Sequence, residues 1–110
     1  MSNKMPDMNA LMRQAQQMQA KVAKAQEEVL SMTADGQAGG GMVTVTVNGA
    51  FDVTRIKIEK DVVDPADIGM LEDLVMSAIN AANARMREVT KQHMGKVMGG
   101  MNIPGMPGMF

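Results

Sequence analysis

The architecture of this chain is limited above all by a long stripe of apolar residues near its N-terminus. From Pro6-Asp7 onward, apolar side chains recur with alternating spacings of three and four residues, which is a heptad pattern. The stripe consists of Met8, Leu11, Ala15, Met18, Val22, Ala25, Val29 and Met32. It predicts a helix about 37 Å long at 1.5 Å per residue. Because this is more than a small domain needs to cover its own sheet, we expect part of the helix to reach beyond the protomer.

The segment after this helix predicts a loop followed by a strand. Residues 33–41, TADGQAGGG, contain four glycines and an Asp-Gly pair, so we expect a turn or loop, with room for a short edge strand before the glycine run. Residues 42–47 alternate Val with Thr, which is typical of a half-buried strand. Asn48-Gly49 then predicts a hairpin turn.

The returning strand is expected over residues 51–59. Its apolar side chains change parity between Val53 and Ile56, which predicts a bulge near Thr54. A three-residue turn that includes Ala50 would pair Val47 with Phe51 and Val45 with Val53, so that apolar side chains face one another.

A second long helix is predicted after Asp64-Pro65, with Asp64 as the N-cap and Pro65 at the first helical position. Small residues fill its middle, which allows close packing. Its apolar positions are Leu71, Leu74, Val75, Ala78, Ile79, Ala82, Met86, Val89 and Val97. Residues 99–110, GGMNIPGMPGMF, contain too many Gly and Pro for regular structure and predict a flexible tail.

These elements predict one α+β domain over residues 1–98: a long helix, a small antiparallel meander or hairpin, and a second long helix. A small sheet with two helices leaves one face and one edge open, so we expect a homodimer with sheet and helix contacts. The alternative is a monomer whose first helix lies on its own sheet. The heptad stripe is narrower than the apolar face of most monomeric core helices, which favours the dimer.

Several classes of site are disfavoured by the sequence. The chain has no Cys and only one His, His93, so neither a thiolate nor a multi-His metal site is expected, and we predict no cofactor. Asp61, Asp64 and Asp67 lack the spacing of a calcium loop, and the glycines of residues 36–41 precede a strand, unlike those of a phosphate-binding loop. With no convergent polar pocket and no long apolar run, we expect no enzyme, no small-molecule substrate and no membrane span.

Charge is segregated along the chain, although the net charge is only -1. Residues 1–24 carry a net +3, residues 60–73 a net -4, and residues 85–96 again a net +3. From charge alone, solvated helix faces are the commoner explanation of such clusters. The chain has no Trp or Tyr to stack on exposed bases, so a DNA partner would be bound through its duplex backbone.

The order and residues of these elements resemble the YbaB/EbfC family of bacterial nucleoid-associated proteins. The most specific likeness is LEDLV followed by Ala, Ile and Asn, because helical periodicity does not require those polar identities. Four stretches carry the resemblance: LMRQAQQMQAKVAKAQEEV from Leu11, GGGMVTVTVNG from Gly39, DVTRIKIE from Asp52, and MLEDLVMSAINAANARM from Met70.

The resemblance implies a homodimeric protein of the cytoplasm and nucleoid that binds double-stranded DNA with low sequence specificity and affects nucleoid organisation and gene expression. Projecting helices would grip the DNA, and the family has no catalytic chemistry. The candidate DNA-binding residues are Arg13, Lys21, Lys24, Arg85, Arg87, Lys91 and Lys96. The alternative is a protein-interaction module that uses the heptad helix and the Met-rich tail, with DNA binding incidental.

Overall fold

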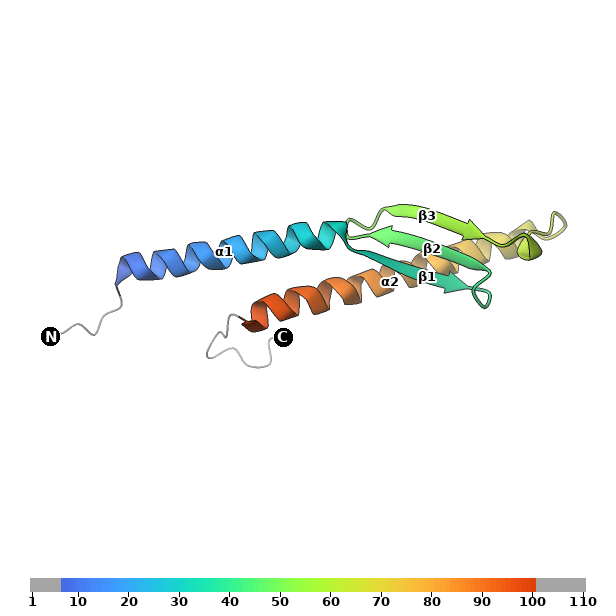
Figure 1. The fold of residues 1–110 in the computed structure, drawn as a ribbon. Coiled ribbons are helices and arrows are strands. Elements are labelled where there is room, and N and C mark those ends of the chain that lie inside the picture. Colours follow the sequence, from blue (N-terminus) through green and yellow to red (C-terminus); the bar gives the residue numbers. More distant parts are fainter. Residues whose placement is uncertain (1–6, 101–110) are drawn as a thin grey trace.

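A three-stranded antiparallel sheet with two long helices forms the fold. The computed structural model describes residues 7–100, and the molecule is elongated, with principal extents of 83 × 24 × 15 Å. In chain order the elements are α1 (Met8–Ser31), β1 (Thr33–Ala38), β2 (Val43–Asn48), β3 (Val53–Ile58), a short 3-10 helix (Lys60–Val62) and α2 (Ile68–Gly100). The strand order is β1-β2-β3, and α2 crosses one face of the sheet (Figure 1). The predicted α+β fold is confirmed.

The first strand is the short edge strand for which the sequence left room before the glycine run, and it occupies most of the segment that was otherwise predicted as a turn or loop. β1 pairs with β2 through six residue pairs, from Thr33 with Asn48 to Ala38 with Val43. Ala34 and Gly36 are buried beneath α2, whereas Asp35 is exposed on the opposite face. Pairing and burial outweigh the low strand propensity of Asp and Gly. Gly36 therefore belongs to the sheet, and the connector is confined to residues 39–42.

The predicted bulge at Thr54 is confirmed, but the predicted register of the hairpin is wrong. Thr46 pairs with Arg55 and Val47 with Val53, which leaves Thr54 as the extra residue. The turn is longer than expected. Asn48 Oδ1 accepts hydrogen bonds from the backbone N–H groups of Ala50, at 2.9 Å, and Asp52, at 3.0 Å. Because of these bonds the turn contains four residues, 49–52. Phe51 adopts a positive φ of 64° within it and does not pair with β2.

The second helix begins three residues later than the sequence predicted. Asp64 Oδ1 accepts from the N–H of Ala66 at 2.9 Å, within a separate turn. Asp67 is the N-cap, because its Oδ1 accepts from the N–H of Met70 at 3.2 Å. At its other end α2 runs to Gly100, two residues into the predicted tail. The rest of that tail, 101–110, lies outside the described residues.

The core lies between α2 and the sheet. Val43, Val45 and Val47 of β2 are completely buried, as are Ala78 and Ala82 of α2. Met86 completes this layer, so a methionine and short aliphatic side chains fill the space that aromatic residues occupy in other small domains. The small residues predicted in the middle of α2 bring that helix so close to β1 that no side chain fits at Gly36.

Candidate nucleic-acid interface

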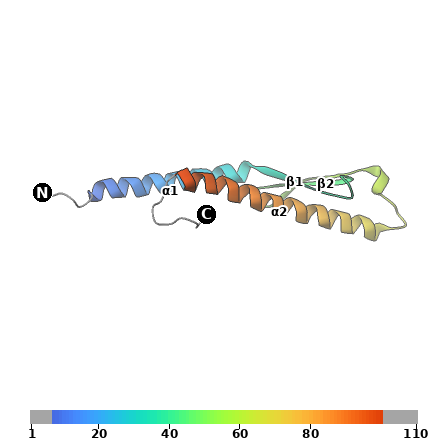
Figure 2. The ribbon, with the colours of Figure 1, turned by 90° about the horizontal axis from the view of Figure 1, so that it is seen from below.

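Two helical arms project from the same end of the sheet. One is α1, and the other is the C-terminal part of α2, which runs antiparallel to it (Figure 1, Figure 2). Ala25 and Val29, near the sheet end of α1, are buried, whereas almost every described residue before Val22 is exposed. The α1 arm therefore presents a long helical surface to solvent, as the heptad pattern predicted.

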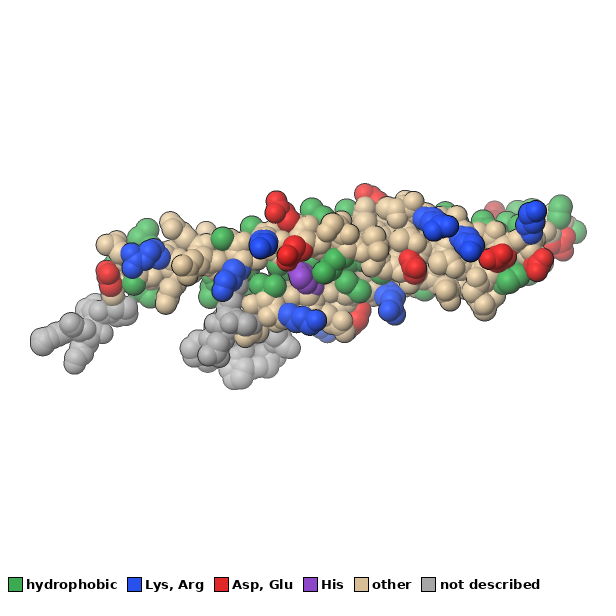
Figure 3. Space-filling model, viewed as in Figure 1, with side chains coloured by type: hydrophobic (Ala, Val, Ile, Leu, Met, Phe, Trp, Pro, Cys, Tyr) green, Lys and Arg blue, Asp and Glu red, His purple; other side chains and the backbone are tan. Residues whose placement is uncertain are grey.

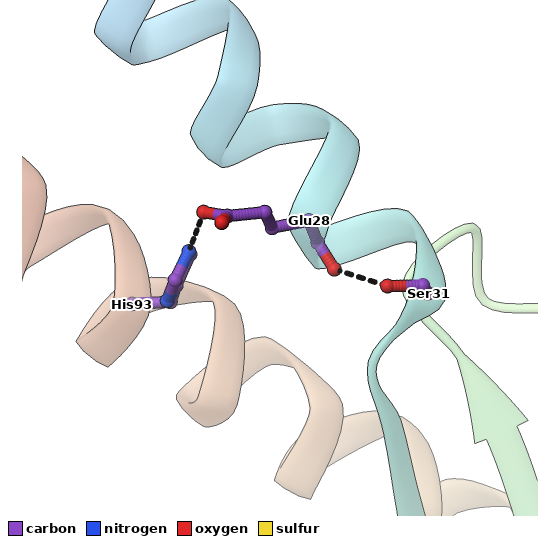
Figure 4. A network of polar contacts seen from close by, with 3 residues as sticks. All are labelled: Glu28, Ser31 and His93. Atoms are coloured by element: carbon purple, nitrogen blue, oxygen red, sulfur yellow. Dashed lines mark hydrogen bonds and ion pairs between the residues drawn. The ribbon is translucent and has the colours of Figure 1, made fainter.

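Among the described residues, one side-chain hydrogen bond links the two arms. His93 Nε2 of α2 lies 3.1 Å from Glu28 Oε1 of α1 (Figure 4), and the ring nitrogen must donate because a carboxylate only accepts. The Ser31 hydroxyl donates to the backbone oxygen of Glu28 at 2.9 Å, where α1 ends. Sequence reasoning assigned His93 no partner, and Glu28 is 65 residues away along the chain. The contact holds the arms together near their base.

The three candidate residues of α1 share one exposed side of the helix. Arg13, Lys21 and Lys24 are all exposed. At 3.6 residues per turn they lie within about 80° of one another around the helix axis. Their mean direction is turned roughly 120° away from the apolar stripe. The stripe therefore leaves these three cations free to face a ligand along the length of the arm.

The four candidate residues of α2 are exposed but do not share one side. Arg85 lies beside the β1 edge, where it lines a hollow with Asp35 and Gln37. Arg87 and Lys91 are four residues apart and lie together on a different side of the helix. Lys96 is exposed on the projecting part. The cluster that is continuous in sequence is therefore divided around the helix.

The candidate cations are not neutralised by neighbouring carboxylates. Within residues 7–100 the one ion pair of a Lys or Arg with a carboxylate is Lys57 with Glu59, at 3.8 Å, and the other close pair is the hydrogen-bonded contact of His93 with Glu28. Neither includes one of the seven candidates. An unpaired Lys or Arg on an exposed surface can exchange its counterions for phosphates without first breaking a salt bridge.

The acidic segment lies at the opposite end of the molecule. The 3-10 helix and the start of α2 carry it, and both are far from the free ends of the arms (Figure 1). Figure 3 shows Lys and Arg side chains on both arms and several Asp and Glu side chains grouped at the far end. The members of the segment are Asp61, Asp64, Asp67, Glu72 and Asp73. Segregation along the sequence thus becomes segregation in space.

Two further cations lie on the sheet face that α2 does not cover. Arg55 pairs with Thr46 and Lys57 with Thr44, so both side chains project away from α2. Both lie on the sheet and not on the arms, so we do not count them among the candidate DNA-binding residues. Sequence reasoning had not placed them. The signal was the alternation of Arg55 and Lys57 with Ile56 and Ile58, which assigns basic and apolar residues to opposite faces of the strand.

The described residues lack the features of a buried polar site. Their core contains no buried polar or charged residue. They contain no group of three or more potential metal ligands, and none of their helices combines the length and apolarity needed to cross a membrane.

Comparison with known proteins identifies the family. A family model described as the YbaB/EbfC DNA-binding family matches residues 5–101. The chain belongs to this family. A nucleoid-associated protein of Syntrophobacter fumaroxidans is 46% identical over 101 residues, covering 90% of this chain and 92% of the relative. A nucleoid-associated protein of Rhodococcus jostii is 46% identical over 104 residues, covering 94% and 92%.

A solved structure supports the same fold for this YbaB/EbfC chain. The crystal structure of an uncharacterized protein from Helicobacter pylori matches with a TM-score of 0.68. The match covers 86% of this chain and 100% of that one at 22% sequence identity. The family model and the named relatives, and not this fold match, support DNA binding and nucleoid association as the function.

Proposed function

We propose that this protein is a nucleoid-associated homodimer that binds double-stranded DNA through its phosphates, with low sequence specificity. The observation that carries the proposal is the set of unpaired, exposed cations on two projecting arms, with the acidic segment at the other end. Lys and Arg would release counterions from the duplex on binding. Cytoplasmic location in the nucleoid, and an effect on nucleoid organisation and gene expression, follow from this role.

The chemistry of the arms favours the duplex backbone over exposed bases. The chain has two Phe and no Trp or Tyr, and Phe51, the one described Phe, lies in the hairpin turn that packs against Val29 at the base of α1, not along the exposed length of the arms. Stacking on unpaired bases needs aromatic side chains. Phosphate contacts set position and carry no sequence information, so we assign no base-reading residue. No cofactor, metal or small-molecule substrate has a part in this proposal.

Dimerisation is supported by the uncovered apolar half of the sheet. Val53, Ile56 and Ile58 pair with the buried β2 residues Val47, Val45 and Val43, so they point to the same side as α2. Yet α2 does not cover β3, and these three side chains remain 42%, 46% and 39% exposed. An apolar row of this kind on an edge strand calls for a covering partner.

The flank of α2 next to β3 continues this apolar surface. Arg85 and Ala81 of α2 line one hollow together with residues of β1, so these two residues lie on the flank of α2 that faces β1. The opposite flank therefore faces β3, and it carries Leu71, Val75 and Ile79 around a second hollow. We propose that the second copy packs between this flank of α2 and β3. The dimer would then be held by both sheet and helix contacts, which is the arrangement expected from the sequence.

The dimer proposal is tested by Ile56→Asp. A carboxylate at the centre of the apolar row would be desolvated by a partner, so we expect the dissociation constant of the dimer to rise by about a hundredfold or more. Sedimentation equilibrium on the full chain measures it. Met12→Asp is the matched control, because Met12 is 58% exposed but lies on the α1 arm. A dimer that survives Ile56→Asp, or a wild-type monomer, contradicts the proposal.

The DNA proposal is tested by reversing charge on the α1 arm. For Lys21→Glu with Lys24→Glu we expect affinity for a random-sequence duplex of about 40 base pairs to fall by about tenfold or more, as measured by fluorescence anisotropy. Lys57→Glu with Lys60→Glu changes the net charge equally but lies away from the arms. Equal losses for both variants would show that net charge alone matters. No binding of the wild type, even at low salt, would favour the protein-interaction module.

A further inference from the structure

The apolar stripe of α1 is covered at one end and uncovered at the other. Ala25 and Val29 are 1% and 6% exposed. The same stripe continues through Met18, at 39%, and Leu11, at 44%, to Met8, at 70%. The change occurs where α2 stops, because α2 runs antiparallel to α1 and ends at Gly100 beside the middle of the arm (Figure 1). The uncovered half therefore lies directly ahead of the end of α2.

An apolar groove leads from the end of α2 onto this stripe. One hollow is lined by Ala15, Met18 and Val22 of α1 together with Met98 of α2. A second is lined by Val22, Met94 and Met98, with a polar rim that includes Lys91. Since Val22 and Met98 line both hollows, the two form one continuous groove between the arms. Its floor is built from methionine, valine and alanine side chains.

The chain that follows Gly100 has the composition to fill such a groove. Residues 101–110 contain no charged side chain. Five of the ten are large and apolar, namely Met101, Ile103, Met106, Met109 and Phe110. Unbranched methionine side chains adapt to an irregular methionine-lined surface. Pro104 and Pro107 disfavour continuation of the helix, so an extended segment is the form that would lie in the groove.

Length and direction also fit. Ten extended residues span about 33 Å at 3.3 Å each. The stripe from Val22 to Met8 is about 21 Å long at 1.5 Å per residue. A segment that leaves α2 beside Met98 and keeps the direction of that helix runs toward the N-terminal end of α1. It can therefore reach every uncovered residue of the stripe.

We infer that residues 101–110 lie in this groove of their own protomer and cover the apolar stripe of the α1 arm. Residues 101–110 would then hold the two arms at a fixed separation farther from the sheet than the His93–Glu28 contact does. The basic residues on the two arms would then be presented at one spacing. The inference concerns contacts within the protomer and does not depend on DNA binding.

Disulfide trapping tests the inference, because the natural chain has no cysteine. In Leu11→Cys with Ile103→Cys, we expect an intrachain disulfide to form at least about tenfold faster than in Asn9→Cys with Ile103→Cys. Asn9 is exposed and lies about 160° around α1 from Leu11, so it is a matched control on the far side. Non-reducing gels of the oxidised full chain measure both rates.

Each other outcome of the trapping overturns the inference. Equal rates for the two pairs would mean that the segment has no preferred place on α1. A predominantly interchain disulfide would place the segment, or the stripe, against a second copy. A chain that ends at Gly100 provides an independent readout. If residues 101–110 cover the stripe, their removal accelerates amide hydrogen exchange in the free end of α1, and unchanged exchange contradicts the inference.

Discussion

Replacing Gly36 with alanine is expected to destabilise the protein by about 3 kcal/mol or more, which is at the upper end of overpacking effects. A Cβ at Gly36 would clash with the backbone nitrogen of Ala82 and the backbone oxygen of Ala78. Backbone atoms of a helix cannot rotate away as a side chain can. The substitution must therefore push α2 off β1 and open the core that these two elements share.

Denaturant unfolding at one fixed protomer concentration measures this effect, because dimerisation would make stability depend on concentration. Gly95→Ala is the matched control. A Cβ at Gly95 would meet nothing within 4 Å, and alanine in a helix is more favourable than glycine by about 1 kcal/mol. We expect that variant to be at least as stable as the wild type. A loss at Gly36 below about 1 kcal/mol would show that α2 shifts away easily.

Gly36 also shows where sequence reasoning reaches its limit. The small residues in the middle of α2 predicted that some element approaches closely. The partner could not be identified, because TADGQAGGG has the composition of a turn, and glycine and aspartate disfavour strands. What makes β1 a strand is its pairing with β2 and the cover of α2. Those interactions are long-range, and no local pattern reports them.

The β2–β3 hairpin was likewise predictable only in part. The change of parity between Val53 and Ile56 was sufficient to predict the bulge at Thr54. The register was not predictable from apolar matching, because it depends on the side chain of Asn48 holding two backbone N–H groups across the turn. The sequence did predict that the two helices would leave part of the sheet open. In the protomer, the apolar face of β3 is left open.

For the candidate site, helix periodicity could group the cations of α1 but could not describe the site as a whole. Arg13, Lys21 and Lys24 lie on one side of a helix, and their spacing alone implies this. The position of Arg85 beside β1 follows from tertiary packing, as does the projection of Arg55 and Lys57 from the open face of the sheet. Charge sign is a property of the sequence, whereas the shape of a charged surface is a property of the fold.

Raising the salt concentration is expected to have the largest effect on DNA binding. If the dimer neutralises six to ten phosphates, its affinity should fall by about 10³ to 10⁵ between 50 and 200 mM salt. Each phosphate contact contributes about -0.9 to the slope of log K against log salt. Seven candidate cations per protomer are enough to supply that number of contacts. Fluorescence anisotropy with a random-sequence duplex across this range of salt gives the slope directly.

The same slope separates phosphate clamping from other sources of salt dependence. In Lys21→Glu with Lys24→Glu, a dimer loses four cations, so the slope should become shallower by about 3 to 4 if all four contact phosphates. Lys57→Glu with Lys60→Glu should leave the slope unchanged, because long-range repulsion shifts affinity without removing contacts. Duplexes of different base composition should give the same slope, since phosphates do not differ between sequences. A wild-type slope near zero is incompatible with DNA binding by the cations of the arms.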